Sequence, residues 1–391
     1  MRKRSILYLQ ISVALYSLAA NFAHPIEPAF FQQLNLPDYT FGVAFACMSF
    51  ACFLFSPFWG KIAERIGIAK VMAIGYGGYV LGQFFFLQAG NVWEVALARL
   101  FAGFFIAAVM DCQIMYILAV EKKEQVGSSL AVMASVSAVF SAFGYLIGGF
   151  IGNRSVRLAI VAQIVGLALI GVLVFVFLGD QPLVHTGKLS LREVNPFSSF
   201  VEMKGILNRM LVLFLLIALL TSLASNCYDQ CFNYFIRDQY GFEPSMNGIL
   251  KGISGIITLV ANGTVSVWLL KKTNIFRSIV PVFVICGAML CGMVVFDAIV
   301  PFIVLNVVLF AFVAIYKPLL QAMIDRMDSG EQGILVGAYN GFNSVGGVIG
   351  SLVAGFMYVV SPRGSFAVAA VCFVAAAVLA VGLRKEYERQ E

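Results

Sequence analysis

A succession of long apolar runs, separated by short polar segments, constrains this chain more than any other feature of its sequence. Most runs are close to the roughly 20 residues that a helix needs to cross the hydrocarbon core of a bilayer. Charged residues make up only 12% of the chain, whereas about 25% is usual in a soluble domain. The sequence therefore predicts an all-α integral membrane protein.

Twelve apolar runs are each predicted to form one membrane-spanning helix. They cover residues 6–32, 40–59, 71–89, 93–120, 127–153, 156–179, 209–236, 246–270, 276–297, 300–325, 332–360 and 364–383. One long polar gap, from Asp180 to Asn208, divides the runs into six and six. We therefore expect an N-terminal six-helix bundle at residues 1–179, a cytoplasmic linker loop at 180–208 and a C-terminal six-helix bundle at 209–391.

The basic residues predict the orientation of these helices. With the N-terminus in the cytoplasm, 19 of the 26 Lys and Arg residues fall in cytoplasmic segments and four fall outside, as the positive-inside rule requires. Both termini should then be cytoplasmic, in a cell membrane such as the bacterial inner membrane. The first apolar run lacks a small-residue cleavage site, so it is predicted to be a helix and not a signal peptide. The net charge of +6 is explained by the basic residues of the cytoplasmic segments, so no nucleic-acid partner is predicted.

A charged stretch bounded by two glycines joins the second and third predicted helices. Its sequence over residues 60–70 is GKIAERIGIAK, and it is predicted to form a short loop at a membrane surface. Gly60 and Gly67 would permit tight turns. Glu64 and Arg65 could form charge-assisted bonds that hold a gate in one conformation. The alternative is a solvated turn that only fixes topology.

This stretch resembles the signature loop of the major facilitator superfamily, whose pattern is Gly, x, Leu, Ala, Asp, Arg, x, Gly, Arg, Lys. Gly60, Ala63, Arg65 and Gly67 fit the pattern, while Glu64 replaces the aspartate. The resemblance implies two pseudo-symmetric six-helix bundles (the MFS fold), with a substrate site between them near the midplane. It also implies a transporter, not an enzyme.

An internal repeat supports the division into two halves. Glu124-Gln125 precedes the fifth predicted helix and Glu331-Gln332 precedes the eleventh, an offset of 207 residues. Both helices carry small residues at four-residue spacing, which allow close packing in lipid and are expected at the domain interface. These residues are Gly144, Gly148 and Gly152 in the fifth helix, and Gly346, Gly350 and Ala354 in the eleventh.

The run from Gly144 to Gly149 adds a second resemblance. It is similar to the antiporter motif of drug exporters, Gly, Pro, x, x, Gly, Gly, with Tyr145 in place of the proline. The resemblance implies a gating role for Gly144, Gly148 and Gly149, and the alternative is ordinary helix packing.

Arg99 in the fourth predicted helix resembles the arginine of a family pattern Arg, x, x, Gln, Gly, with Ala102 in place of glutamine. An arginine at the centre of a membrane helix costs about 2.5–3.5 kcal/mol on insertion scales, so it should find a partner inside the protein. We predict a gating role for it, and the alternative is that the side chain reaches the outer membrane surface.

Four ionisable residues are best placed within the predicted helices: Glu27, Asp111, Asp229 and Lys317. They lie on the first, fourth, seventh and tenth helices, which line the central cavity in the facilitator fold. The 207-residue offset maps Asp111 onto position 318, next to Lys317, so the two halves are predicted to present opposite charges at equivalent depths. A substrate or proton that neutralised either charge would release such a pair, and the alternative is a purely structural pair.

Asp229 is the predicted proton carrier, with Asp111 and Glu27 as further proton-coupling candidates. Asp229 resembles in position the acidic residue of the seventh helix in drug/proton antiporters, and a carboxylate at bilayer depth can gain and lose a proton in each cycle. The alternative is a carboxylate that faces an outer vestibule and stays ionised. Lys317, followed by Pro318, resembles the basic residue and proline on the tenth helix of such antiporters.

The predicted substrate site consists of polar and aromatic residues on the cavity helices, where aromatic linings suit hydrophobic ligands. Its residues are Asn21, His24, Asp111, Tyr116, Asn226, Asp229, Tyr316 and Lys317. His24 and Glu27 share a face of the first helix, within a stretch broken by Pro25 and Pro28. An outer-end kink is the alternative for this stretch.

The sequence as a whole predicts a monomeric multidrug antiporter that exports hydrophobic or amphipathic small molecules by alternating access. Protons are the predicted coupling ion, membrane lipids surround the protein, and no cofactor or metal is predicted because the chain has only two histidines and no CxxC or Walker motif. One alternative is an importer or uniporter of a charged metabolite, such as an organic anion or small peptide. Another is a non-transporting sensor or a lipid flippase.

Overall fold

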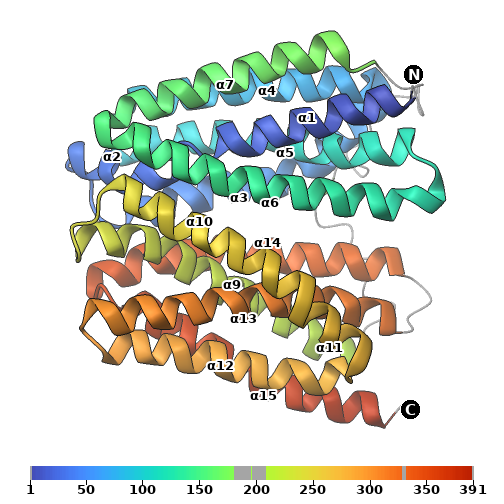
Figure 1. The fold of residues 1–391 in the computed structure, drawn as a ribbon, viewed down its shortest axis with the longest axis vertical. Helices are drawn as coiled ribbons and strands as arrows, with labels where there is room; N and C mark the ends of the chain where they lie inside the picture. The colour runs from blue at the N-terminus through green and yellow to red at the C-terminus, as the bar shows by residue number, and fades with distance from the viewer. Residues whose placement is uncertain (1, 180–194, 196–207, 328–331, 390–391) are drawn as a thin grey trace. The chain divides into compact units, whose positions relative to one another are not determined.

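The computed structural model describes residues 2–179, 195, 208–327 and 332–389. Almost all of the predicted linker loop at 180–208 lies outside these residues, so the division of the chain at that loop stays a prediction. Within the described part of the chain every regular element is a helix (Figure 1).

The first half of the chain forms α1 (Arg2–Ala20), η1 (His24–Ile26), α2 (Glu27–Gln33), α3 (Thr40–Ile66), α4 (Ile68–Gln88), α5 (Val92–Val120), α6 (Lys123–Arg154) and α7 (Val156–Phe177). The second half forms α9 (Arg209–Asp238), α10 (Pro244–Ala261), η3 (Asn262–Ser266), α11 (Val267–Lys272), α12 (Ile275–Val295), α13 (Ile299–Arg326), α14 (Gln332–Val360) and α15 (Gly364–Glu388). Eleven helical segments among the described residues are long and apolar enough to cross a membrane. The remaining predicted span is α4, whose 21 residues include glycines, tyrosines and glutamines that lower its mean hydropathy. The predicted fold class is confirmed.

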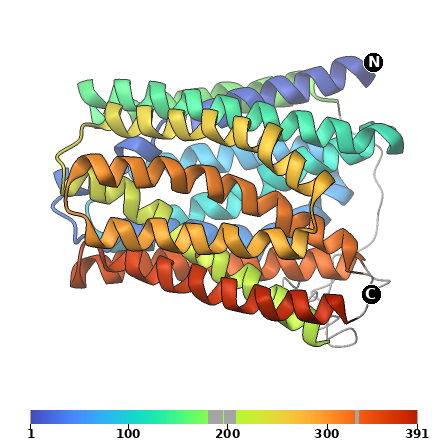
Figure 2. The same cartoon turned by 60° about the horizontal axis from the view of Figure 1, so that its bottom comes forward.

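The helices group into two compact units. The first unit comprises Met1–Thr40, Cys47–Pro196 and Ile236–Gly255, and the second comprises Phe41–Ala46, Phe197–Phe235 and Ile256–Glu391. In the first unit α1 packs along α6 and α7, and α4 packs against α5 and α7 (Figure 1). In the second unit α12 packs between α13 and α15, and Figure 2 shows light-orange α12 beside red α15.

The first predicted helix, at residues 6–32, is broken into three pieces. α1 ends at Ala20, and Pro25 and Pro28 lie in the first turns of η1 and α2, where a residue without an N–H costs no hydrogen bond. Because the helix breaks here, the Ala20 carbonyl is available to a side chain, and it accepts a hydrogen bond from Gln163 Nε2 at 2.8 Å. The proline-broken stretch expected from the sequence is therefore present.

The loop predicted at residues 60–70 is largely wrong. α3 continues to Ile66, and the only break before α4 is Gly67, which has φ 108°. Lys61 and Glu64 form an ion pair of 3.0 Å one turn apart, and Arg65 Nη1 donates to the Lys61 carbonyl at 3.0 Å. These contacts stabilise helix, because residues three or four apart are neighbours on a helix surface. Gly67 alone needs the freedom of glycine, since L side chains rarely adopt its φ.

Candidate functional site

Three polar residues, one in the last turn of α1 and two in the segment that follows it, lie against α6 in the first unit. The hydroxyls of Ser17 and Ser137 are 2.8 Å apart, and Asn21 Nδ2 donates to Ser141 Oγ at 3.1 Å. The His24 ring stacks on the Tyr145 ring, with centroids 5.7 Å apart and planes at 20°. The spacing of four and three residues keeps Ser17, Asn21 and His24 on one side of the chain. We call this contact the α1–α6 ladder.

A second contact of the same kind joins α9 to α14 in the second unit. Ser222 Oγ donates to the Asn343 carbonyl at 2.6 Å. Asn226 lies against Gly347, where an added Cβ would meet Asn226 Nδ2 at 3.3 Å. Asp229 follows three residues later and is half-buried. We call this contact the α9–α14 ladder, since Ser222, Asn226 and Asp229 repeat the spacing of the α1 residues.

The two ladders also match in detail. Asn21 Nδ2 donates to the Ser17 carbonyl at 2.7 Å, and Asn226 Nδ2 donates to the Ser222 carbonyl at 2.9 Å, each four residues back. Ser17 and Ser222, Asn21 and Asn226 are thus equivalent positions, separated by 205 residues. The same offset makes Asp229 the equivalent of His24.

Glycine contacts give the register of the remaining helices. A Cβ added at Gly144 would meet the Leu18 carbonyl oxygen, and one added at Gly350 would meet that of Leu223. Gly248 likewise faces the Tyr145 carbonyl, and Gly42 faces that of Ser351. α6 and α14 are therefore offset by 206 residues, one fewer than the predicted 207. The same offset, extended to α5 and α13, would align Asp111 with Lys317.

Arg99 of α5 forms a buried ion pair with Glu27 of α2. The guanidinium carbon is 3.8 Å from the centroid of the Phe86 ring, and His24 Nδ1 is 3.5 Å from Glu27 Oε1. The Arg99 side chain is only 3% exposed, so it has the internal partner that its place in a membrane helix requires. The pair joins α2 to α5, and His24 connects it to the α1–α6 ladder.

Asp111 of α5 and Lys317 of α13 belong to different units, so their pairing stays a prediction. Asp111 is half-buried and hydrogen-bonded to the Ser56 side chain. Its other oxygen, Oδ2, is buried and has no hydrogen-bond partner among the described residues. Such an atom costs free energy in the membrane interior, so it marks a place where a proton or a ligand would bind favourably. Lys317 is exposed.

Two predicted substrate contacts lie inside their own units. Tyr116 is fully buried, and its hydroxyl donates to the Gly179 carbonyl at 3.2 Å. Tyr316 is 3% exposed, and its hydroxyl lies 2.5 Å from Ser225 Oγ. Both hydroxyls are thus engaged with protein groups. The predicted contact of these tyrosines with substrate stays a prediction.

The predicted gating glycines hold helices close together. Gly144 lies against the Leu18 carbonyl of α1, and Gly148 lies against the Phe22 carbonyl just after α1. A Cβ added at Gly149 would lie 2.5 Å from the Pro244 carbonyl oxygen of α10. Gly60 differs from these, because an added Cβ there would meet no atom within 4 Å. The gating roles of these glycines, and of Glu64, Arg65, Gly67 and Arg99, stay predictions.

Several residues of the ladders were missed in the sequence. A single serine in an apolar helix gives no signal of function, because serine is common. We therefore did not single out Ser17, Ser137, Ser141 or Ser222 from the sequence. The signal was present as Ser, x, x, x, Asn at residues 17–21 and again at 222–226. Among the described residues no three His, Cys, Asp or Glu side chains gather as a metal site would require.

Two solved transporter structures have the same fold as this chain. The chain superimposes on the nucleoside transporter NupG with a TM-score of 0.78, 14% identity and coverage of 98% of this chain and 99% of that one. It superimposes on a bacterial homologue of the iron transporter ferroportin with a TM-score of 0.74, 11% identity and coverage of 97% and 98%. The chain therefore shares its fold with these two proteins.

Sequence comparison identifies the family. Residues 9–324 match the Major Facilitator Superfamily, and the chain belongs to it. Multidrug resistance protein 2 of Bacillus subtilis is 21% identical over 359 residues, covering 91% of this chain and 89% of the relative. The class E tetracycline resistance protein of Escherichia coli is 24% identical over 366 residues, covering 91% and 88%. The quinolone resistance protein NorA of Staphylococcus aureus is 20% identical, covering 91% and 90%.

Proposed function

We propose that this transporter exports hydrophobic or amphipathic small molecules in exchange for protons, by alternating access. The relatives named for resistance to multiple drugs, tetracycline and quinolones support export of such compounds. The observation that carries proton coupling is the placement of titratable groups at equivalent positions of the two repeats, His24 with Asp229 and Asp111 with Lys317. Ionisable groups inside a membrane are costly and mark ion or substrate pathways.

In this proposal Asp229 is the proton carrier. It follows Asn226 on the α9–α14 ladder, whose close helix contact at Gly350 would transmit a change at Asp229 to α14. Asp111 contributes the buried, unpartnered Oδ2, and a proton there would remove a charge that the membrane interior disfavours. Lys317 offers a cation to the substrate or to Asp111. The conformational change would then follow from which of these charges is neutralised.

Proton coupling is tested in inverted membrane vesicles with a fluorescent lipophilic cation in the external medium, which an exporter carries into the vesicle lumen. Transport should depend on the pH gradient and should be lost in Asp229→Asn, because the amide cannot carry a proton. The matched control is Asp238→Asn, which removes an exposed carboxylate at the end of the same helix. Unchanged gradient-dependent transport in Asp229→Asn would falsify the coupling role.

Uptake of a charged metabolite is the second candidate, favoured by the exposed ammonium of Lys317 within α13. It predicts uptake of a labelled organic anion that is lost in Lys317→Ala and retained in Asp229→Asn. Under either function we place the protein in a bacterial plasma membrane as a monomer with both termini in the cytoplasm, on the charge distribution of its loops.

A further inference from the structure

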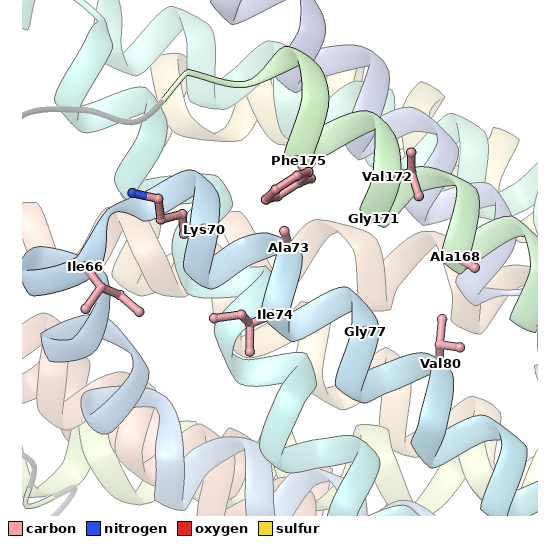
Figure 3. Close-up of a pocket in the computed structure, with 10 residues that line it drawn as sticks. All are labelled: Ile66, Lys70, Ala73, Ile74, Gly77, Val80, Ala168, Gly171, Val172 and Phe175. Atoms are coloured by element: carbon pink, nitrogen blue, oxygen red, sulfur yellow. The ribbon is translucent and has the colours of Figure 1, made fainter.

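An apolar groove runs along the surface of the first unit between α4 and α7 (Figure 3). Its volume is about 620 Å³. Small residues, among them Ala73, Gly77 and Gly171, line the groove. Their short side chains leave space along its length. Large apolar side chains border it, and Ile74 and Phe175 are 45% and 70% exposed. The groove is therefore an open apolar surface that a flexible hydrocarbon chain could fill.

The length of the groove matches one membrane leaflet. Figure 3 shows Lys70 at one end of the groove, and Val80 with Ala168 at the other. Ten residues of α helix separate Lys70 from Val80, which is about 15 Å at 1.5 Å per residue. The hydrocarbon core of a bilayer is about 30 Å thick. A single acyl chain would thus lie along the groove from a membrane surface to the midplane.

The charge at the surface end selects the headgroup. Lys70 is exposed in the first turn of α4, three residues after the break at Gly67, and among the described residues that line the groove it alone is charged. A lysine near the membrane surface attracts anionic lipids. We propose that this groove binds an anionic phospholipid, with one acyl chain along α4 and α7 and the phosphate paired with Lys70.

Native mass spectrometry of the purified full chain tests the proposal with phosphatidylglycerol as the probe and phosphatidylcholine as the neutral comparison. Lys70→Gln should lower the affinity for phosphatidylglycerol about fivefold, the factor expected for one lysine beside an anionic lipid, and should leave phosphatidylcholine unchanged. Lys272→Gln, which removes an exposed lysine at the end of α11, should change neither. Equal effects of the two lysine variants would overturn the role of Lys70.

Filling the groove gives an independent test. An added Cβ at Gly77 meets no protein atom within 4 Å, so Gly77→Leu should fold normally and occupy the space of the acyl chain. It should abolish binding of one molecule of either lipid. Gly127→Leu is the matched control, because Gly127 is equally open and lies on α6 outside the groove. Retention of the full lipid complement in Gly77→Leu would contradict the proposal, as would equal lipid loss in the control.

Discussion

At the scale of single residues, Arg99 shows how far a sequence argument reaches. Its place in an apolar run requires an internal partner, because an unpaired arginine in the bilayer is costly. The sequence offered several carboxylates and gave no reason to choose one. The structure pairs it with Glu27, which is 72 residues away along the chain, and covers its face with Phe86. The partner depends on how α2 and α5 pack.

Removing one member of this pair should destabilise the protein more than removing both. Glu27→Leu leaves Arg99 as an unpaired buried charge, and Arg99→Met leaves Glu27 with only the neighbouring His24. Breaking a buried ion pair in this way costs about 3–5 kcal/mol. The double variant removes both charges and should regain most of the loss. Thermal unfolding in detergent would show this as a higher Tm for the double variant than for either single one. Additive losses in the double variant would argue that the pair does not form.

At the scale of helices, the stretch from Gly60 to Lys70 was predicted incorrectly for a physical reason. Two glycines and four charged residues suggest a loop, yet local ion pairing allows α3 to continue as helix to Ile66. Charged residues indicate that a segment lies outside the hydrocarbon core of the membrane. They do not indicate where its helix ends. Only the backbone at Gly67, with its positive φ, decides that.

Substitution of the two glycines by alanine separates a helix from a loop. Gly60→Ala should stabilise the protein by about 0.5–1 kcal/mol, because alanine costs less entropy inside a helix and meets no neighbour there. Gly67→Ala should lower the Tm, since alanine does not readily adopt φ 108°. If Gly60 were in a turn, its variant would be neutral or destabilising.

At the scale of the whole molecule, the internal repeat relates a charged residue of the first unit to one of the second. The offset of 206 residues between α6 and α14, applied to α5 and α13, aligns Asp111 with Lys317, and the two side chains have opposite charge. Whether they meet during transport depends on the conformational cycle. A pair that alternately forms and separates would bias the equilibrium between the conformations.

Exchanging the two charges tests that coupling. Asp111→Lys and Lys317→Asp should each abolish gradient-dependent export, because like charges would then face one another. The double exchange restores opposite charges and should recover part of the transport. The measurement is dye export in inverted vesicles with expression levels matched. If the double variant inserts normally into the membrane and recovers no transport, the two charges do not act as a pair.

The sequence by itself determined that the chain crosses a membrane as a bundle of helices and that it resembles the facilitator superfamily. These conclusions follow from the apolar content of each run. That content is a local property of the sequence, and it determines whether a segment inserts into a membrane. Only the tertiary structure decided the partner of Arg99, the end of α3 and the offset of 206 residues between α6 and α14. Each of these depends on close packing between segments far apart in the chain, where one residue of register changes which side chains meet.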